Sequence, residues 1–481
     1  MERNSLFKNT VYNIVYMIIN LIFPLVSAAY VARILQPDGI GSVAYAQNIT
    51  SYFVSLAQLG IPTYGVREIA KVRVSRERLN DTSSELLLIN FCSTTVALLF
   101  YYIFVGVGNI FFEDRVLFLC YGIIIVFNYI NVDWFFQGIE EYGYIMVRGL
   151  AVKCLMFFSL ILFVRNQNDY IIYAVINCLA VGGNNVFNII HLRKYVNFHI
   201  HGLELKRHIM PLTILAISIF LSSLYSKVDI TMLGSMCSKQ VTGYYTYAHK
   251  IPEMIITVCI AVTGVFLPRL SYYYTNNKDE FYRLLDLGIK ILWFLTVPTA
   301  VAFYLLASKI IVVIFGIRFS PAIFTARLFT VLIIVKSFGN LLCYQLVICT
   351  GNERKRLPAF FSAAVLNIVF NKLLIPHFAQ NGAAVASIIS ELVVNSIQFF
   401  AMKKILTISL NKKAFLQALG SAAGMGIVIY MILKSPLSDL PQLICSVMSG
   451  VCTYLILNLI FRNEIMVQSL YKFNELIKRR S

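Results

Sequence analysis

Five lysines and arginines lie inside segments that are otherwise apolar enough to cross a membrane: Lys153, Lys227, Lys250, Arg327 and Lys336. A single charge at the centre of a bilayer costs roughly 2.5–3.5 kcal/mol even on a lenient insertion scale. Five such charges facing lipid would cost as much as the net stability of a typical domain, about 5–15 kcal/mol. We therefore expect these side chains to face a protein interior or a watery cavity, where cations favour an anionic cargo.

Four carboxylates also lie in the apolar segments, where a carboxylate normally pairs with a cation or faces water. They are Asp133, Asp229, Glu253 and Glu391. Asp133 follows Asn131 and precedes Trp134 near the end of an apolar run. It is either a cavity carboxylate that binds a cation or partners a lysine, or an interfacial group that reaches for water beside a membrane-interface tryptophan.

The spacing of the charges indicates which of them can meet. Lys227 and Asp229 are two residues apart, on different faces of a helix, so each needs a partner elsewhere. Lys250 and Glu253 are three apart and can pair on one face. Pro252 lies between them and is expected to distort the helix around a site, unless the helix starts near Ile251 and the charges stand at its entrance.

The last two charged positions of interest are Arg327 and Lys336, nine residues apart and therefore on different sides of a helix. Either can line water or cap a carboxylate such as Glu391. At the other end of the chain, Arg33 ends the first apolar run and is a sixth candidate for cargo contact. Pro24, in the middle of that run, predicts either a gating bend or a static kink, and we assign hinge roles to Pro24 and Pro252.

Composition requires these residues to be held by membrane helices. The 481 residues are 58% hydrophobic and only 13% charged, against about 25% charged in soluble domains. The apolar runs are continuous and about 20 residues long, which favours helices over a barrel of alternating strands. We predict an all-α polytopic membrane protein with about 14 spans. The expected spans are 9–35, 40–61, 84–108, 115–137, 143–164, 169–190, 211–235, 243–268, 287–308, 321–348, 357–376, 382–403, 412–433 and 439–461.

A weak internal repeat organises these spans. Gly41 opens the second span in the pattern G-x-x-x-Y-A, and Gly243 opens the eighth in the same pattern. Six spans separate the two, which preserves orientation and predicts parallel repeats with cargo bound between the halves. We therefore expect a six-helix bundle over 1–208, a second over 209–405, and two further helices with a basic tail over 406–481.

The net charge of +18 is explained by basic residues crowding into cytoplasmic connections rather than by nucleic-acid binding. With the N-terminus inside, most of the 41 lysines and arginines fall in connections on the cytoplasmic side. This bias predicts a multi-pass protein of the cytoplasmic membrane with both termini in the cytoplasm.

The motifs of several other functions are missing from the sequence. None of the ten cysteines forms a CxxC pair, and there is no Walker A sequence, haem signature or HExxH. We expect no metal site, no cofactor and no catalytic residues, so the chain is predicted to be a secondary transporter rather than an enzyme.

Three motifs resemble those of bacterial polysaccharide repeat-unit flippases, in the multidrug/oligosaccharidyl-lipid/polysaccharide exporter superfamily. They are the N-terminal run from Asn13 to Ala70, the segment Asp133 to Glu140, and Val228-Asp229 with Met232 to Gly234. After Arg33-Ile-Leu the family usually has glycine, whereas Gln36 and Pro37 follow here.

The resemblance implies a V-shaped, two-bundle transporter. It implies that an undecaprenyl-pyrophosphate-linked oligosaccharide moves from the inner to the outer leaflet for O-antigen or capsule biosynthesis, by ion-coupled alternating access. Carried over to this sequence, the resemblance makes Asp133, Asp229, Glu253 and Glu391 the candidate ion-coupling residues. Polysaccharide polymerase and chain-length proteins would be partners alongside membrane lipids. A pyrophosphate cargo suits cations in a low-dielectric cavity.

Three alternatives stay open. A multidrug exporter of the same superfamily should favour acidic cavity residues for cationic drugs, whereas these are basic. A lipid II flippase is separated from a polysaccharide flippase only by the motifs. A membrane-embedded polysaccharide polymerase commonly carries a large external loop, and the expected outer loops are short.

Overall fold

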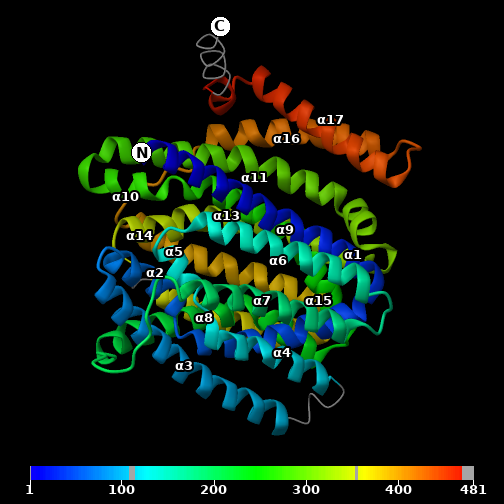
Figure 1. The fold of residues 1–481 in the computed structure, drawn as a ribbon. Helices are drawn as coiled ribbons and strands as arrows, with labels where there is room; N and C mark the ends of the chain where they lie inside the picture. The colour runs from blue at the N-terminus through cyan, green and yellow to red at the C-terminus, as the bar shows by residue number, and fades with distance from the viewer. Residues whose placement is uncertain (1, 108–113, 353–355, 469–481) are drawn as a thin grey trace. The chain divides into compact units, whose positions relative to one another are not determined.

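The structure, a computed structural model, describes residues 2–107, 114–352 and 356–468, with side chains from residue 22 onward except 356 and 357. Every regular element in this part of the chain is a helix (Figure 1). In chain order these are α1 (Glu2–Gln58), α2 (Ile61–Val72), α3 (Arg76–Val107), α4 (Arg115–Phe127), η2 (Asn128–Ile130), α5 (Asp133–Gly138), α6 (Tyr142–Phe163), α7 (Tyr170–Leu192), α8 (Lys206–Met236), α9 (Lys239–Gly264), α10 (Leu267–Asn276), α11 (Lys278–Phe315), η3 (Ile317–Phe319), α12 (Ala322–Leu328), α13 (Thr330–Gly339), η4 (Asn340–Gln345), α14 (Leu346–Cys349), α15 (Arg356–Lys403), α16 (Lys412–Leu433) and α17 (Asp439–Ile460).

The predicted all-α membrane architecture is confirmed. Ten helical segments of the described residues are long and apolar enough to cross a membrane. The shorter apolar stretch Arg115–Ile130 adds another span. Two pairs of expected spans each form one long element, α1 and α15, which accounts for about 14 spans in all. Most of the expected basic tail, residues 469–481, lies outside the described residues.

A single non-helical residue divides each of the two long elements. In α1 it is Gln36, with φ 58° and ψ −179°, and in α15 it is Ala379, with φ 47° and ψ −127°. Both conformations are ones that residues with a side chain rarely adopt. Pro37 contributes to the first break, because proline disfavours the α conformation in the residue before it. The breaks coincide with the expected boundaries between spans.

The fourth expected span, 115–137, is not one helix. The chain forms α4 and then the short helix η2, which ends at Ile130. A separate helix, α5, begins at Asp133. Asn128 lies at the break, where its side-chain nitrogen donates to Asn90 Oδ1 at 3.0 Å and Thr94 Oγ1 at 2.8 Å. The Trp134 indole donates to the Asn131 carbonyl at 3.1 Å. Local hydrogen bonds from side chains compete with the backbone hydrogen bonds of a helix, which favours a break at this point.

The tenth expected span, 321–348, contains a change of helix type. The chain runs through α12 and α13 into η4, a one-turn π-helix over Asn340–Gln345, and then α14. Gln345 is buried, and its side-chain nitrogen donates to Asn340 Oδ1 at 3.0 Å. Such π-segments occur frequently at functional sites.

The contacts divide the chain into two compact units, Met1–Gly243 and Tyr244–Ser481. Within the first unit, α1, α3, α4 and α7 enclose an apolar core. Tyr101 is fully buried there, and its hydroxyl donates to the Phe118 carbonyl at 2.6 Å. A second cluster holds Trp134, 2% exposed, against Gly65 of α2, where an added methyl would lie 2.7 Å from the indole ring.

Within the second unit, α11 is the central helix and packs against α13, α16 and α17. Figure 1 shows α16 and α17 running alongside each other. Trp293 of α11 packs its ring against Phe338 and Phe415, with centroids 4.2 and 4.7 Å away. Its indole nitrogen donates to the Leu410 carbonyl at 2.7 Å. The side chains of this unit therefore form their own core.

The compact units are not the same division as the predicted bundles. The predicted first boundary, between residues 208 and 209, follows the sequence repeat. In the structure α8 packs on α1 and belongs to the first unit, so the contact boundary falls after Gly243. The organisation into six, six and two helices remains a prediction about topology.

The two glycines of the repeat lie against each other's segments within the first unit. A methyl group on Gly41 would lie 1.7 Å from the Lys239 carbonyl oxygen, and one on Gly243 would lie 2.1 Å from the Pro37 carbonyl oxygen. No side chain fits at either position without moving backbone. Small residues of this kind let membrane helices approach closely, and here they bring the start of α9 against the second half of α1.

Candidate functional site

A cluster of ionisable side chains gathers in the second unit on α9 and α13. The Glu253 carboxylate lies 3.4 Å from His249 Nδ1, one helical turn away. It also interacts electrostatically with Lys336 and, more weakly, with Lys250. The structure therefore unites three of the residues proposed from sequence and adds His249, which the sequence analysis did not single out.

The two lysines of this cluster have no hydrogen-bond partner among the described residues. Lys250 and Lys336 are both half-buried, and both interact electrostatically with Glu253. Two half-buried ammonium groups beside one carboxylate, whose side chain is 63% exposed, leave a surplus of positive charge at an accessible face of an apolar unit. Charges removed from water are normally paired, so this surplus can be matched by an anion from outside the chain.

Arg327 is a second incompletely satisfied cation of this unit. Its guanidinium lies over the Tyr304 ring, with the central carbon 5.5 Å from the ring centroid. Its Nε is buried and has no hydrogen-bond partner in the described structure. The carboxylate suggested as a partner, Glu391, accepts a hydrogen bond from Asn395 at 3.5 Å. A cation–π contact leaves the donors of a guanidinium available to an anion.

Lys227, in the first unit, is held by a polar seam between α1 and α8. Its ammonium donates to Ser51 Oγ at 2.9 Å, and the Asn48 side chain donates to the Lys227 carbonyl at 2.9 Å and to Thr231 Oγ1 at 2.7 Å. Tyr52 shares a hydrogen bond with the same threonine at 3.0 Å. This lysine therefore has a structural partner, unlike the two lysines of the second unit.

The other predicted residues of the first unit are dispersed. Asp229 is buried, 5% exposed, whereas Lys227 is half-buried, as expected for two positions on different helix faces. Lys153 is half-buried on α6, and Arg33 is exposed at the end of the first half of α1. These four residues lie on three different helices, α1, α6 and α8.

Asp133 pairs with a cation, but the cation is an arginine. Arg148 Nη1 lies 2.9 Å from Asp133 Oδ1, and the Asn188 amide bonds to both side chains. Arg148 is only 7% exposed, and its Nε has no hydrogen-bond partner among the described residues. The sequence analysis did not single out Arg148. The signal available was its position inside the expected span 143–164.

Neither proline breaks its helix. α9 begins at Lys239 and continues through Pro252 to Gly264, so the helix does not start near Ile251. Pro24 lies inside helical backbone, and the break in α1 comes at Gln36 instead. A proline removes one backbone donor, and neighbouring helices can support the bend. The hinge roles of Pro24 and Pro252 remain predictions.

A buried ionic network near the start of α8 was missed. Glu85 is 2% exposed and receives bonds from Arg207, from His208 Nε2 at 2.8 Å and from the Glu204 backbone nitrogen at 2.7 Å. Tyr64 bonds to the other ring nitrogen of His208 at 2.8 Å. More than a hundred residues separate Glu85 from its partners in sequence, so no local spacing could reveal the network.

Many apolar helices with charged side chains among them define a polytopic membrane protein. The chain belongs to the Polysaccharide biosynthesis protein family, whose model matches residues 6–273. The model of the Lipid II flippase MurJ family also matches, over residues 171–440.

Relatives of similar length carry glycan-related names. The chain is 20% identical over 405 residues to the Putative O-antigen transporter of Escherichia coli (strain K12), covering 83% of this chain and 97% of the relative. It is 25% identical over 424 residues to Capsular polysaccharide biosynthesis protein CapF of Staphylococcus aureus, covering 83% and 99%.

Solved structures share the fold. The Lipid II flippase MurJ in an inward closed conformation superposes with a TM-score of 0.77 at 15% identity, covering 95% of this chain and all of the other. An inward-facing multidrug resistance MATE family transporter gives 0.66, also at 15% identity, over 84% and 99%. The solved structures show the shared fold, whereas the family models and the named relatives confirm the predicted resemblance to polysaccharide flippases and support a transporter.

Proposed function

We propose that this protein moves polyprenyl-pyrophosphate-linked oligosaccharide repeat units from the inner to the outer leaflet of the cytoplasmic membrane, for O-antigen or capsule biosynthesis. The observation that carries the proposal is the surplus of positive charge at Lys250 and Lys336 beside one carboxylate. A pyrophosphate supplies the anionic oxygens that these ammonium groups lack within the described chain. The names of the O-antigen and capsule relatives support the glycan part.

Within this proposal each group has a role. Lys250, Lys336 and Arg327 bind the pyrophosphate as the cargo enters the second unit. Glu253 is the leading coupling carboxylate, because it lies among those cations and next to His249, and protonation there would change the net charge of the cluster. The carboxylate then competes with the cargo for the same lysines, which links ion binding to cargo release during alternating access. The cargo passes to a polymerase and chain-length machinery outside.

The test is complementation of a deletion strain. Deletion is expected to remove the surface glycan and strand lipid-linked repeat units on the inner leaflet. Wild type and Lys412→Gln, an exposed lysine at the start of α16, should restore the glycan, whereas Lys250→Gln and Lys336→Gln at equal expression should not. An unchanged surface glycan in the deletion strain, with altered drug sensitivity instead, would overturn the proposal in favour of a multidrug exporter.

A lipid II flippase is the second candidate, favoured by the MurJ family model over residues 171–440. Its cargo carries the same polyprenyl pyrophosphate, so the cationic cluster fits both. The stranded intermediate separates them. Accumulation of a peptidoglycan precursor with arrested growth identifies lipid II as the cargo, and accumulation of glycan repeat units in growing cells identifies the polysaccharide precursor.

A further inference from the structure

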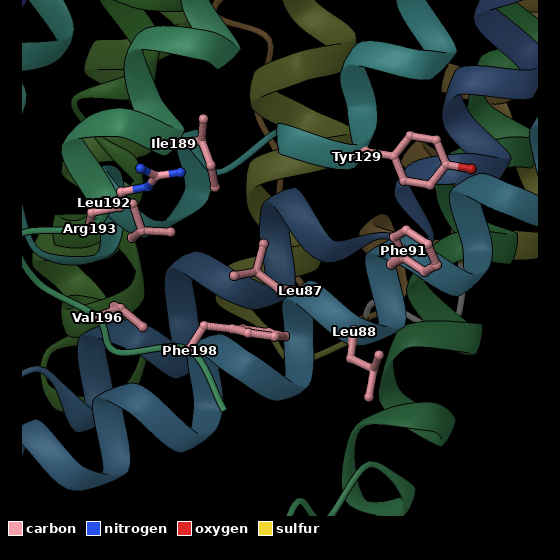
Figure 2. Close-up of a pocket in the computed structure, with 9 residues that line it drawn as sticks. All are labelled: Leu87, Leu88, Phe91, Tyr129, Ile189, Leu192, Arg193, Val196 and Phe198. Carbon is pink, nitrogen blue, oxygen red and sulfur yellow. The ribbon is translucent and has the colours of Figure 1, made fainter. Parts of the chain in front are cut away.

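A concave apolar surface opens on the first unit between α3, α7 and the segment that follows α7. Its volume is about 470 Å³. Figure 2 shows its side chains from these elements and from η2, with Arg193 and Tyr129 at opposite ends of the group. Leu87, Ile189 and Phe198 are among the apolar residues that line the space between them. We call this surface the α3–α7 groove.

The α3–α7 groove lies at one boundary of the expected hydrocarbon layer. Leu87 and Phe91 fall within the first two turns of the expected span 84–108, and α7 ends at Leu192, where the chain leaves its own span. Phe91 and Phe198 are 56% and 54% exposed, far more than core residues. At this depth hydrocarbon, not water, is the medium that covers apolar walls.

Arg193 gives the groove a charge that the described protein does not match. It is exposed at the C-terminal end of α7, and its guanidinium has no ion pair or hydrogen bond with any described residue. Lys194 beside it is exposed and likewise without such a partner in the described structure. Arginine presents a planar fork of donors that suits the oxygens of a phosphate.

The carboxylates nearby are already engaged. Asp81 pairs with His199 at 3.1 Å, and Glu85 binds Arg207 and His208. A third carboxylate, Glu141, lies 3.5 Å from His191 and accepts a hydrogen bond from Tyr195. None of these carboxylates forms an ion pair with Arg193, so its exposed guanidinium is available to an anion from outside the described chain.

We infer that the α3–α7 groove is a binding site for one anionic phospholipid of the surrounding bilayer, independent of the cargo. The headgroup phosphate binds Arg193, with Lys194 adding charge, and an acyl chain lies between Leu87, Ile189 and Phe198. Charge complementarity at the end and hydrocarbon complementarity along the walls select this occupant. Such a lipid would join α3, α7 and the segment after α7 at this end of the unit.

The test is lipid retention by the full-length protein in native mass spectrometry, with phosphatidylglycerol and phosphatidylcholine as the probes. Arg193→Gln should weaken phosphatidylglycerol binding about fivefold, which corresponds to about 1 kcal/mol per basic residue at an anionic surface. Phosphatidylcholine binding should change little, and Arg193→Lys should recover most of the loss. Ile189→Trp, which fills the groove, should reduce retention of phosphatidylglycerol while the charge remains.

The matched control is Lys404→Gln, an exposed basic residue just beyond α15 that should leave retention unchanged. Unfolding temperatures in the same detergent exclude variants that lose their fold. The inference is overturned if Arg193→Gln and Ile189→Trp behave like the control. It is also overturned if Arg193→Gln weakens both lipids equally, because the headgroup would then not be recognised.

Discussion

At the scale of single residues, Arg148 and Lys336 are both cations inside apolar helices, but their surroundings differ. Arg148 is buried and bonds to Asp133 and Asn188. Lys336 is half-buried, interacts electrostatically with Glu253 and has no hydrogen bond to a described residue. A buried cation with its charge partner is part of the structure, whereas a half-buried cation without a hydrogen bond costs stability and is kept for another reason.

Removing Asp133 should therefore destabilise the protein. Asp133→Asn leaves Arg148 buried without its charge partner, and we expect a loss of about 1–3 kcal/mol in the free energy of unfolding. The double variant Asp133→Asn with Arg148→Gln should recover much of this loss, since no buried charge remains unpaired. Denaturation in detergent measures all three forms. Equal stability of the single variant and wild type would contradict a paired, structural role.

Removing Lys336 should reduce export without reducing stability, in contrast to removing Asp133. We expect Lys336→Gln to leave the unfolding temperature unchanged or higher, because it relieves a surplus charge, while glycan export falls about tenfold or more through loss of a charged contact to cargo. Asp133→Asn serves as the comparison, since it changes stability first. A destabilised Lys336→Gln that exports normally would show that this lysine has a structural role.

At the scale of elements, the breaks in α1 and α15 carry local strain. Gln36 and Ala379 occupy positive φ values at which glycine is favoured, and such conformations cost about 1–3 kcal/mol each for other residues. The sequence resemblance implied glycine at the position of Gln36. The structure supplies the physical reason, since the chain turns there before Pro37.

Glycine at these breaks should stabilise the protein. Gln36→Gly and Ala379→Gly should each raise the free energy of unfolding by about 1 kcal/mol by relieving the positive φ. Ala364→Gly, in helical backbone of the same α15, is the control and should lower it by about 1 kcal/mol. If Ala379→Gly proves as harmful as Ala364→Gly, the break is not a strained conformation in solution.

The crossing of α1 and α9 should be intolerant of any side chain. Gly41→Ala places a methyl 1.7 Å from the Lys239 carbonyl oxygen, so we expect a loss of about 1–3 kcal/mol from forced backbone shifts. Gly106→Ala of α3 is the matched control, because nothing lies within 4 Å of its added methyl. Thermal unfolding of the two variants in detergent compares them. Equal unfolding temperatures for the two variants would mean that α1 and α9 can move apart at little cost in stability.

The approximate positions of the membrane-spanning helices could be predicted from the sequence where long apolar runs define them. The fourteen spans were predictable because lipid demands long apolar segments with satisfied backbone groups. The break before Asp133 and the π-helix at Asn340–Gln345 were not, because side-chain hydrogen bonds from distant positions determine them. Buried asparagine and glutamine are visible in a sequence, but their partners are not.

At the scale of the whole molecule, sequence predicted the candidate residues better than their groupings. Lys250 and Glu253 were expected to pair because they share a helix face. In the structure they interact electrostatically, but the residue that pairs with Glu253 is His249, one helical turn away. Lys336 joins them from α13, and Arg148 replaces a lysine as the partner of Asp133. Both of these meetings depend on tertiary contacts within one unit, which spacing along the chain does not encode.

The two compact units also differ from the sequence repeat for a tertiary reason. The repeat places the start of the second half before α8, whereas hydrogen bonds from Asn48 and Lys227 join α8 to α1. The sequence repeat indicates which helices of the two halves correspond to each other, whereas the contacts show which helices pack together. Of the two divisions, the unit Met1–Gly243 contains both α1 and α8 and therefore the hydrogen bonds between them.

The distribution of the two tryptophans has a spectroscopic consequence. Trp134 lies in the first unit, 2% exposed, and Trp293 lies in the second. A chain carrying Trp293→Phe therefore emits indole fluorescence from the first unit alone, and one carrying Trp134→Phe emits from the second alone. Adding a lipid or a polyprenyl-linked glycan to each variant would reveal which unit senses it, with no dye attached to the protein.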